Sequence, residues 1–222
     1  MKTALINGSP KIVMQKSDPC ASHALLLAVR RSLRHNHIHD TEDFHVKTGT
    51  LSQEELDELF SCDVWIFSFP LYSAGIPSHF LRFMLLAGEY ARKKAGRKPV
   101  SEEITADPED SMIHVYAVVN CGLYEGNEAR PVLEMLEQWC ESSGFAWGSG
   151  VGVGGGMAFA NSHILSLGIR KWHSLGRVLS SFAVAVAGKM SAGNFYCSPN
   201  VSKKFYVSGM NRYLRKRMKN NN

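Results

Sequence analysis

Short apolar runs alternate with amphipathic segments along most of this 222-residue chain, and no other feature constrains the fold as strongly. The runs at 3–6, 63–70 and 112–120 predict strands, while the segments between them carry apolar residues at helical spacing. The near-continuous apolar character of 63–70 is typical of a parallel strand that is covered on both faces. The alternation therefore predicts an α/β protein with a parallel sheet, helices on both of its faces and right-handed connections.

The same pattern gives each expected element a residue range. In the first helix, apolar residues between Leu25 and Leu33 share one face. Ser52, followed by Glu55 three residues later, predicts a capping box at the start of another helix. The polar segment 96–111 is expected to be a loop, because it combines Pro, Gly and closely spaced charges. Strands are expected at 3–6, 43–47, 63–70, 112–120 and 146–155, and helices at 22–33, at 52–60, within 77–94, at 128–144 and in the helical region 161–190.

Length and composition exclude several classes of protein. A 222-residue chain with 45% hydrophobic residues can bury a full core, and its length favours one domain, or one domain with an appendage. The apolar stretch near the start is too short for a signal peptide, and the longest later stretch, 178–187, is far below the ~20 residues that span a bilayer. The five cysteines are odd in number and lack Cys-x-x-Cys spacing, which argues against a disulfide framework or a metal site. We therefore expect a cytoplasmic protein with no membrane span.

The net charge of +5 conceals a strong asymmetry. Residues 1–141 contain 14 bases against all 20 acids, a net charge of −6, whereas residues 142–222 contain 11 bases and no acid, a net charge of +11. Such a basic end suits nucleic acid, an anionic membrane surface or a phosphorylated small molecule as a partner. It also suits a solvated end that only aids solubility, and composition alone does not choose between these roles.

Three loops that follow predicted strands have unusual sequences: 7–11, 69–78 and 120–128. In a doubly wound sheet, ligands bind beyond the carboxyl ends of the strands. These three loops are therefore the candidate site.

The first loop, Asn-Gly-Ser-Pro at 7–10, has the composition of an anion site. If the chain leads from there into the first helix, the free N–H groups at the helix start and the hydroxyls of Ser9, Ser17 and Ser22 would form a phosphate cradle. The loop has neither the Walker pattern nor the Gly-x-Gly-x-x-Gly pattern of a dinucleotide-binding turn. A plain turn is the alternative, because Gly and Pro occur wherever a chain reverses, and Ser17 would then belong to a turn that caps the helix.

Taken together, the three loops resemble those of the flavodoxin-like NAD(P)H-dependent FMN oxidoreductases. The likeness covers roughly the first 160 residues, and the tail "FYCSPNVSKKF" is similar to members with a helical C-terminal extension. The matching motifs are Gly8-Ser9-Pro10 with Ser22, then Pro70-Leu71-Tyr72 followed by Gly75 and Pro77, and then "NCGLYEG" from Asn120. The resemblance implies that the FMN phosphate is held by Ser9, Pro10, Ser17 and Ser22, one side of the flavin ring by Pro70, Leu71, Tyr72 and Ser73, and its other side by Asn120, Cys121, Gly122 and Tyr124.

The resemblance also implies a fold and an activity. The fold would be a flavodoxin-like doubly wound sheet of five parallel strands in the order 2-1-3-4-5 over residues 1–160, with a helical, basic extension over 161–222 packed on the same domain. The protein would take hydride from NADPH or NADH and reduce a quinone, a flavin, a nitro or azo compound, or a protein. FMN performs this chemistry itself, so no catalytic side chain is expected. A homodimer is also implied.

Two functions of other classes remain as alternatives. A flavodoxin-type electron carrier would bind FMN without using NAD(P)H, but such carriers are usually small and acidic, unlike this chain. A nucleic-acid-binding protein would use the basic C-terminal third, yet no nucleic-acid-binding motif is recognisable. Both alternatives are therefore disfavoured.

The C-terminal region contains two further candidates. The apolar helix around 175–187 would provide a dimer face, or would pack on the sheet of its own chain. In the last residues, bases alternate with apolar residues, so a short helix there would offer Arg212, Arg215 or Lys216 to the phosphate of the nicotinamide cofactor. As a chain end, the same segment would equally fray in solvent.

Several other residues invite a functional reading and also have a structural one. Tyr72 and Tyr124 would stack on or edge the flavin ring, with backbone N–H groups of 71–73 and 121–123 bonded to its polar rim, or they would be half-buried packing residues. Cys121 is expected to be a buried thiol rather than a nucleophile, because no partner base is placed beside it. The glycine-rich segment 148–156 is interpreted as a strand that opens into a flexible loop. His35, His37 and His39 are expected at a solvated helix end rather than in a metal site.

Overall fold

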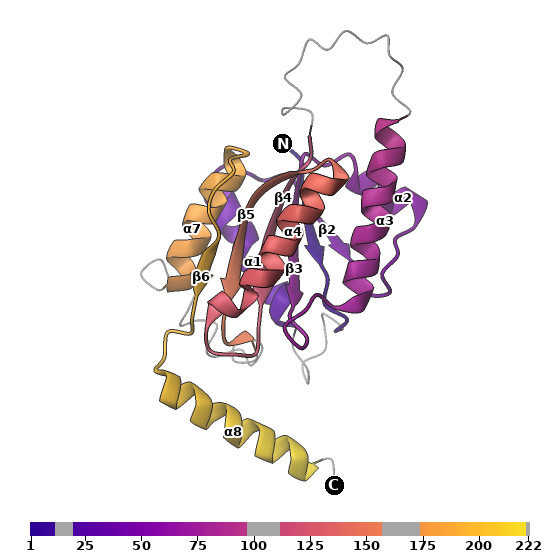
Figure 1. The fold of residues 1–222 in the computed structure, drawn as a ribbon. Coiled ribbons are helices and arrows are strands. Elements are labelled where there is room, and N and C mark those ends of the chain that lie inside the picture. Colours follow the sequence, from indigo (N-terminus) through magenta and orange to yellow (C-terminus); the bar gives the residue numbers. More distant parts are fainter. Residues whose placement is uncertain (12–19, 97–111, 157–173, 221–222) are drawn as a thin grey trace.

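The structure, a computed structural model, describes residues 1–11, 20–96, 112–156 and 174–220, and it has the expected α/β architecture (Figure 1). The long loop expected at 96–111 and the segment 161–173 lie outside the described residues, apart from Gly96. The elements, in chain order, are β1 (Thr3–Asn7), α1 (Ala21–His35), β2 (Thr41–His45), α2 (Gln53–Leu59), β3 (Val64–Pro70), α3 (Ser78–Ala95), β4 (His114–Asn120), the 3₁₀ turn η1 (Gly126–Ala129), α4 (Arg130–Ser143), β5 (Ala146–Val153), α7 (Ser174–Ala187), β6 (Phe195–Cys197) and α8 (Lys203–Asn220).

The sheet has six strands in the order β2-β1-β3-β4-β5-β6, and every pairing between neighbours is parallel. This confirms the doubly wound order 2-1-3-4-5 and corrects the strand count, which was expected to be five. The additional strand, β6, pairs with the last three residues of β5, Val151 to Val153. It lies inside the region that was expected to be helical, so the C-terminal extension also contributes to the sheet.

Two hydrophobic cores cover the two faces of the sheet. On one face, α2, α3 and α4 pack over the aromatic side chains of β3, with Phe67 and Phe80 among the residues at the centre. On the other face, α1 and α7 pack over Leu5, Ile66 and Val118. The strands therefore have buried side chains in both directions, which explains their near-continuous apolar sequences.

The apolar helix near residue 175 covers the sheet of its own chain. In α7, the side chains that face inward belong to the same core as those of α1, and Phe182 packs edge to face against Tyr116 of β4 at 5.7 Å between ring centroids. The sequence left open whether this helix provides a dimer face or packs on the sheet of its own chain, and in the structure it packs on that sheet. The expected domain boundary at 160 lies outside the described residues.

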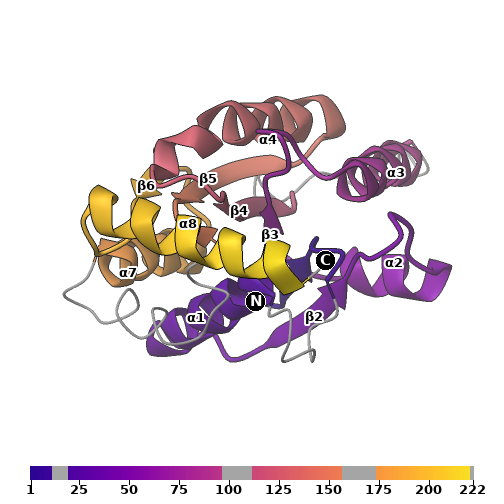
Figure 2. The ribbon, with the colours of Figure 1, turned by 90° about the horizontal axis from the view of Figure 1, so that it is seen from below.

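The last helix, α8, lies across the carboxyl edge of the sheet. In Figure 1 it is the separate helix below the strands, and the view from below in Figure 2 shows it crossing from the side of β6 toward that of β1 and β3. It has 18 residues, so the short helix expected at the end of the chain is longer and begins earlier, at Lys203. None of the described helices combines the length and the apolar character needed to cross a membrane.

Candidate functional site

The first loop is held in a tight turn by its own side chains. The Oδ1 atom of Asn7 accepts the N–H of Ser9 at 3.0 Å, and the Ser9 hydroxyl accepts the N–H of Lys11 at 3.3 Å. Ser9 is buried, whereas Pro10 is exposed. Ser17, the third serine of the expected phosphate cradle, lies outside the described residues.

Two histidines that the sequence analysis did not single out support this loop from neighbouring elements. The Nε2 atom of His79, at the start of α3, lies 3.0 Å from the carbonyl oxygen of Gly8, and Nε2 of His45, at the end of β2, lies 3.0 Å from that of Ser9. A carbonyl only accepts hydrogen bonds, so both rings donate from Nε2. Both histidines follow strands that end at this edge, which is the signal that could have identified them.

The start of α1 is the second component of the expected phosphate cradle. The Sγ atom of Cys20 caps the helix by accepting the N–H of His23 at 3.4 Å. Ser22 is buried in the first turn. The N–H groups of Ala21 and Ser22 have no partner among the described residues, so two donors at the positive end of the helix remain for an anion.

The second loop forms a hairpin-like turn directly after β3. Tyr72 and Gly75 exchange backbone hydrogen bonds of 3.1 and 2.9 Å. Between them, Ser73 and Ala74 have φ values of +49° and +62°, in the left-handed region that residues with side chains seldom adopt. Such strained backbone is concentrated at ligand-binding loops. Tyr72 itself is 48% exposed.

Asn120, the last residue of β4, joins the start of α1 to the second and third loops. Its Oδ1 atom accepts the hydroxyl of Ser22 at 3.0 Å, across 98 positions of the sequence. Its backbone carbonyl accepts the N–H of Leu71 from the second loop at 2.8 Å. The third loop begins at the next residue, so one buried asparagine fixes the relative positions of the candidate site residues on three elements.

The glycines after β5 support the third loop. The N–H groups of Gly155 and Gly156 each donate at 2.6 Å, to the carbonyls of Leu123 and Cys121 respectively. A Cβ atom at Gly154 would lie 2.0 Å from the carbonyl oxygen of Tyr124, so this close approach requires glycine. The strand expected in this segment is confirmed as β5, and the glycines that follow it hold the loop opposite them.

Cys121 is a buried thiol, as expected. Its Sγ atom lies 3.4 Å from the carbonyl of Glu125 and 3.7 Å from that of Leu123. Burial raises the pKa of the Cys121 thiol, which keeps it protonated at neutral pH. A protonated thiol is a poor nucleophile, so the side chain contributes shape rather than chemistry.

Tyr124 contacts the C-terminal segment. Its hydroxyl donates to the carbonyl of Val201 at 2.7 Å, and its ring lies 5.6 Å from that of Tyr206 in α8. Tyr206 is buried and donates its own hydroxyl to the carbonyl of Gly122 at 2.7 Å. Of the two roles left open for Tyr124, packing is the one these contacts favour, and the hydroxyl is bonded to the chain rather than to solvent.

Not all of the backbone donors expected around a flavin ring are free. The N–H of Leu71 is bonded to Asn120, that of Tyr72 to Gly75 and that of Cys121 to Val153. Of the six N–H groups in 71–73 and 121–123, those without a partner among the described residues belong to Ser73, Gly122 and Leu123. They lie on both sides of the same cavity.

This cavity, of about 290 Å³, separates the second and third loops. It is lined by Leu71, Ser73, Ala74, Cys121, Gly122, Leu123 and Glu128. A pocket of this size, with apolar walls and a few polar groups, is typical of small-molecule sites. Four of the twelve predicted site residues therefore share one cavity: Leu71, Ser73, Cys121 and Gly122.

The three histidines at the end of α1 and directly after it lie at the surface. His35, His37 and His39 are all exposed, as expected for a solvated helix end. Within the described ranges, no group of three or more His, Cys, Asp and Glu side chains is arranged to hold a metal ion.

Solved structures with a similar fold include several oxidoreductases. A flavone reductase matches with a TM-score of 0.57 at 13% identity, over 87% of this chain and 66% of its own. An NADH:FMN oxidoreductase in its apo form gives 0.54 at 13%, over 86% and 90%. An NADPH-quinone reductase from P. pentosaceus gives 0.52 at 14%, over 82% and 96%.

Other comparisons give no further relative: no protein-family model matches the sequence, and no curated protein matches it. At the identities of these structures, the likeness concerns the fold. A short-chain flavodoxin also matches, with a TM-score of 0.51 over all of its own chain. The chain therefore has the flavodoxin-like fold that its three loops predicted, and the solved structures that it is similar to include NAD(P)H-dependent reductases.

Proposed function

We propose that the protein is an FMN-dependent oxidoreductase that takes hydride from NAD(P)H and passes electrons to a second acceptor. The observation that carries the proposal is the position of Asn120, which joins Ser22, in the first turn of α1, to both loops that border the cavity. The start of α1 and the cavity between the two loops are thus held at one edge of the sheet, where doubly wound folds bind their ligands.

The residues present fit FMN at both ends. At the phosphate end, the first turn of α1 offers the N–H groups of Ala21 and Ser22, and the buried Ser9 hydroxyl, which accepts the N–H of Lys11, keeps its own proton. The Ser22 hydroxyl donates its proton to Asn120, so it would reach a phosphate by exchanging that bond. At the ring end, Ser73, Gly122 and Leu123 offer N–H groups around an apolar cavity. FMN, when bound, supplies the hydride and electron transfer. The protein's part is to orient the ring, exclude water and stabilise negative charge on it with these donors.

Binding of FMN through its phosphate is the first testable consequence. Ser9→Ala combined with Ser22→Ala should weaken FMN by roughly tenfold or more, because hydrogen bonds to a charged phosphate each contribute about 1.5–3 kcal/mol. Riboflavin, which lacks the phosphate, should lose much less. Titration followed by flavin fluorescence measures both affinities, and Ser142→Ala, an exposed serine in α4, is the matched control. Equal losses for FMN and riboflavin would show that the phosphate does not bind at Ser9 and Ser22. No binding of FMN at micromolar concentration would refute the proposal.

Hydride transfer is the second consequence, and it separates an enzyme from an electron carrier. NADPH or NADH, mixed anaerobically with the FMN-loaded protein, should bleach the flavin absorption band, and an added quinone should restore it. A flavodoxin-type carrier would keep the oxidised band for minutes. Quinone, flavin, nitro or azo compounds and proteins are all to be tried as acceptors.

A further inference from the structure

Two more cavities lie beside the cavity between the second and third loops, here called the ring cavity, on the side toward α8. The second, of about 370 Å³, shares Gly122, Leu123 and Glu128 with the first. The third, of about 830 Å³, shares Lys203, Val207 and Asn211 with the second. Neighbouring cavities therefore share lining residues, so the three form a series from the loops at the sheet edge to the last helix, here called the path.

The charges along this path change sign. Near the loops, Glu125 and Glu128 line the middle cavity, and Glu125 is paired with Lys203 at 3.1 Å. Along α8, the third cavity is lined by Lys204, Arg212 and Arg215 in addition to Lys203. Because the last 81 residues contain no acid at all, phosphates of a bound molecule would be favoured at the α8 end and disfavoured beside the loops.

The middle of the path is apolar on the α8 side. Val207, Met210 and Leu214 face the third loop across the second cavity, at the helical spacing of three and four residues. This wall suits an uncharged ring. The path thus combines the apolar wall of Val207, Met210 and Leu214 with a cationic section that runs from Lys203 to Arg215, about 18 Å of helix.

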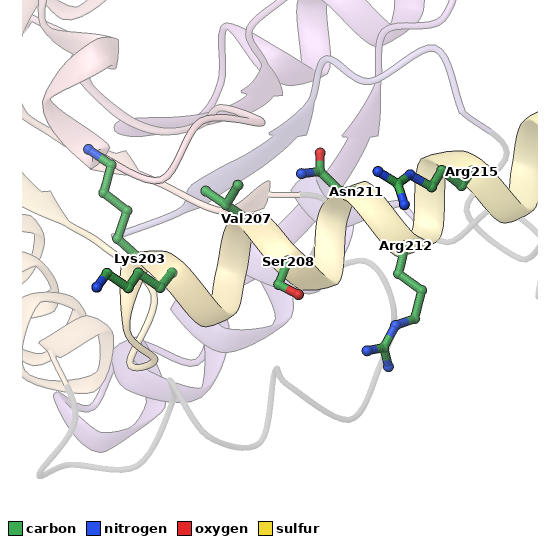
Figure 3. A pocket seen from close by; sticks show the side chains of 7 residues that line it. Lys203, Val207, Ser208, Asn211, Arg212 and Arg215 are labelled. Atoms are coloured by element: carbon green, nitrogen blue, oxygen red, sulfur yellow. The ribbon is translucent and has the colours of Figure 1, made fainter.

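Three cations of the third cavity have no anionic partner among the described residues. Lys203 is paired with Glu125, but no ion pair joins Lys204, Arg212 or Arg215 to a described acid. Figure 3 shows Arg212 and Arg215 pointing in different directions from α8, with Ser208 on the side of Arg212 and Asn211 on that of Arg215, so a hydrogen-bonding group accompanies each charge. Arginine presents a planar fork of donors that matches a phosphate group.

We propose that α8 binds the phosphates of the nicotinamide nucleotide, with Arg212 and Arg215 selecting NADPH over NADH through its 2′-phosphate. The inference rests on the proposed function, because it takes the nicotinamide ring to lie toward the flavin. A 2′-phosphate adds about −1.5 to −2 charge at neutral pH, and the unpaired cations of the third cavity complement that charge. The anchoring of α8 by Tyr206 at Gly122 fixes this cationic face relative to the loops.

The test compares a double variant with a matched control. Arg212→Gln with Arg215→Gln removes two charges from the third cavity, while Arg34→Gln with Arg177→Gln removes two from exposed positions on α1 and α7. In the FMN-loaded full chain, calorimetry with the oxidised nucleotides, which carry no hydride to pass to the flavin, should give an NADP⁺ dissociation constant roughly tenfold or more higher for the first variant, and a smaller rise for NAD⁺. The control should change neither by more than about twofold.

A binding experiment on the protein without flavin tests this inference independently of the proposed function. Adenosine 2′,5′-bisphosphate should bind the flavin-free full chain and lose affinity in the Arg212/Arg215 variant, whether or not FMN binds. If FMN binds and NADPH bleaches it, but both double variants bind NADP⁺ equally, the role of α8 is refuted and the proposed function stands. If the Arg212/Arg215 variant instead loses only a salt-dependent affinity for duplex DNA, the basic face serves nucleic acid and the inference is wrong.

Discussion

Gly8 has no room for a side chain. A Cβ atom there would lie 2.4 Å from Cδ2 of Phe80, a fully buried ring. Phe80 cannot move aside, because its ring packs against those of Phe67, Phe69 and Phe83 at centroid distances of 5.2, 4.7 and 5.5 Å. The glycine of the Gly-Ser-Pro motif is therefore required by the core beneath the loop, whatever the loop binds.

This packing predicts that Gly8→Ala destabilises the protein even without a ligand. Overpacking of a buried site costs about 1–3 kcal/mol, which corresponds to a fall of roughly 2–12 °C in the thermal midpoint for a chain of this size. Thermal unfolding of the flavin-free protein, followed by circular dichroism, measures this fall in the midpoint. Gly193→Ala is the control, since no atom lies within 4 Å of a Cβ there. An unchanged midpoint with weakened FMN binding would show that the glycine serves the ligand instead.

Most elements could be predicted because their signals are local. The capping box of α2 is present as expected, with the Ser52 hydroxyl accepting the Glu55 N–H at 3.2 Å and the Glu55 carboxylate accepting the Ser52 N–H at 2.8 Å. In contrast, β6 has three residues in a segment rich in turn-forming residues, and it is a strand only because the edge of β5 is available for pairing. No pattern within Phe195–Cys197 carries that information.

The candidate site likewise has parts that could be predicted from the sequence and parts that could not. The three loops could be located because parallel strands bring their carboxyl ends to one edge, a rule that needs only the order of elements. The bond from His79 to Gly8 and that from Tyr124 to Val201 join residues 71 and 77 positions apart, so they depend on how helices and loops pack. For that reason the sequence left the role of Tyr124 open, and the structure places it against the C-terminal segment.

As a whole, the molecule is a closed two-core domain with one helix outside it. The cores extend to Cys197, and beyond Pro199 the buried side chain among the described residues is Tyr206. The side chains of Phe205, Val207, Leu214 and Met218 in α8 are exposed by 45–69%, and that of Met210 is half-buried. The helix therefore contributes little to the stability of the fold, although it borders the path that leads from the ring cavity.

This organisation predicts that a chain cut after Ser202 still folds. The cut removes the burial of one tyrosine and its bond to Gly122, together about 2–4 kcal/mol, so the thermal midpoint should fall by roughly 10 °C while unfolding remains cooperative. FMN should still bind, because the loops that border its cavity are intact, whereas NADPH should bind more weakly than to the full chain. Circular dichroism, flavin titration and calorimetry measure the three quantities on the same preparation. Loss of the cooperative transition would mean that α8 is part of the folding unit. If the truncated chain folds and binds FMN but its affinity for NADPH is unchanged, α8 does not contribute to the nucleotide site.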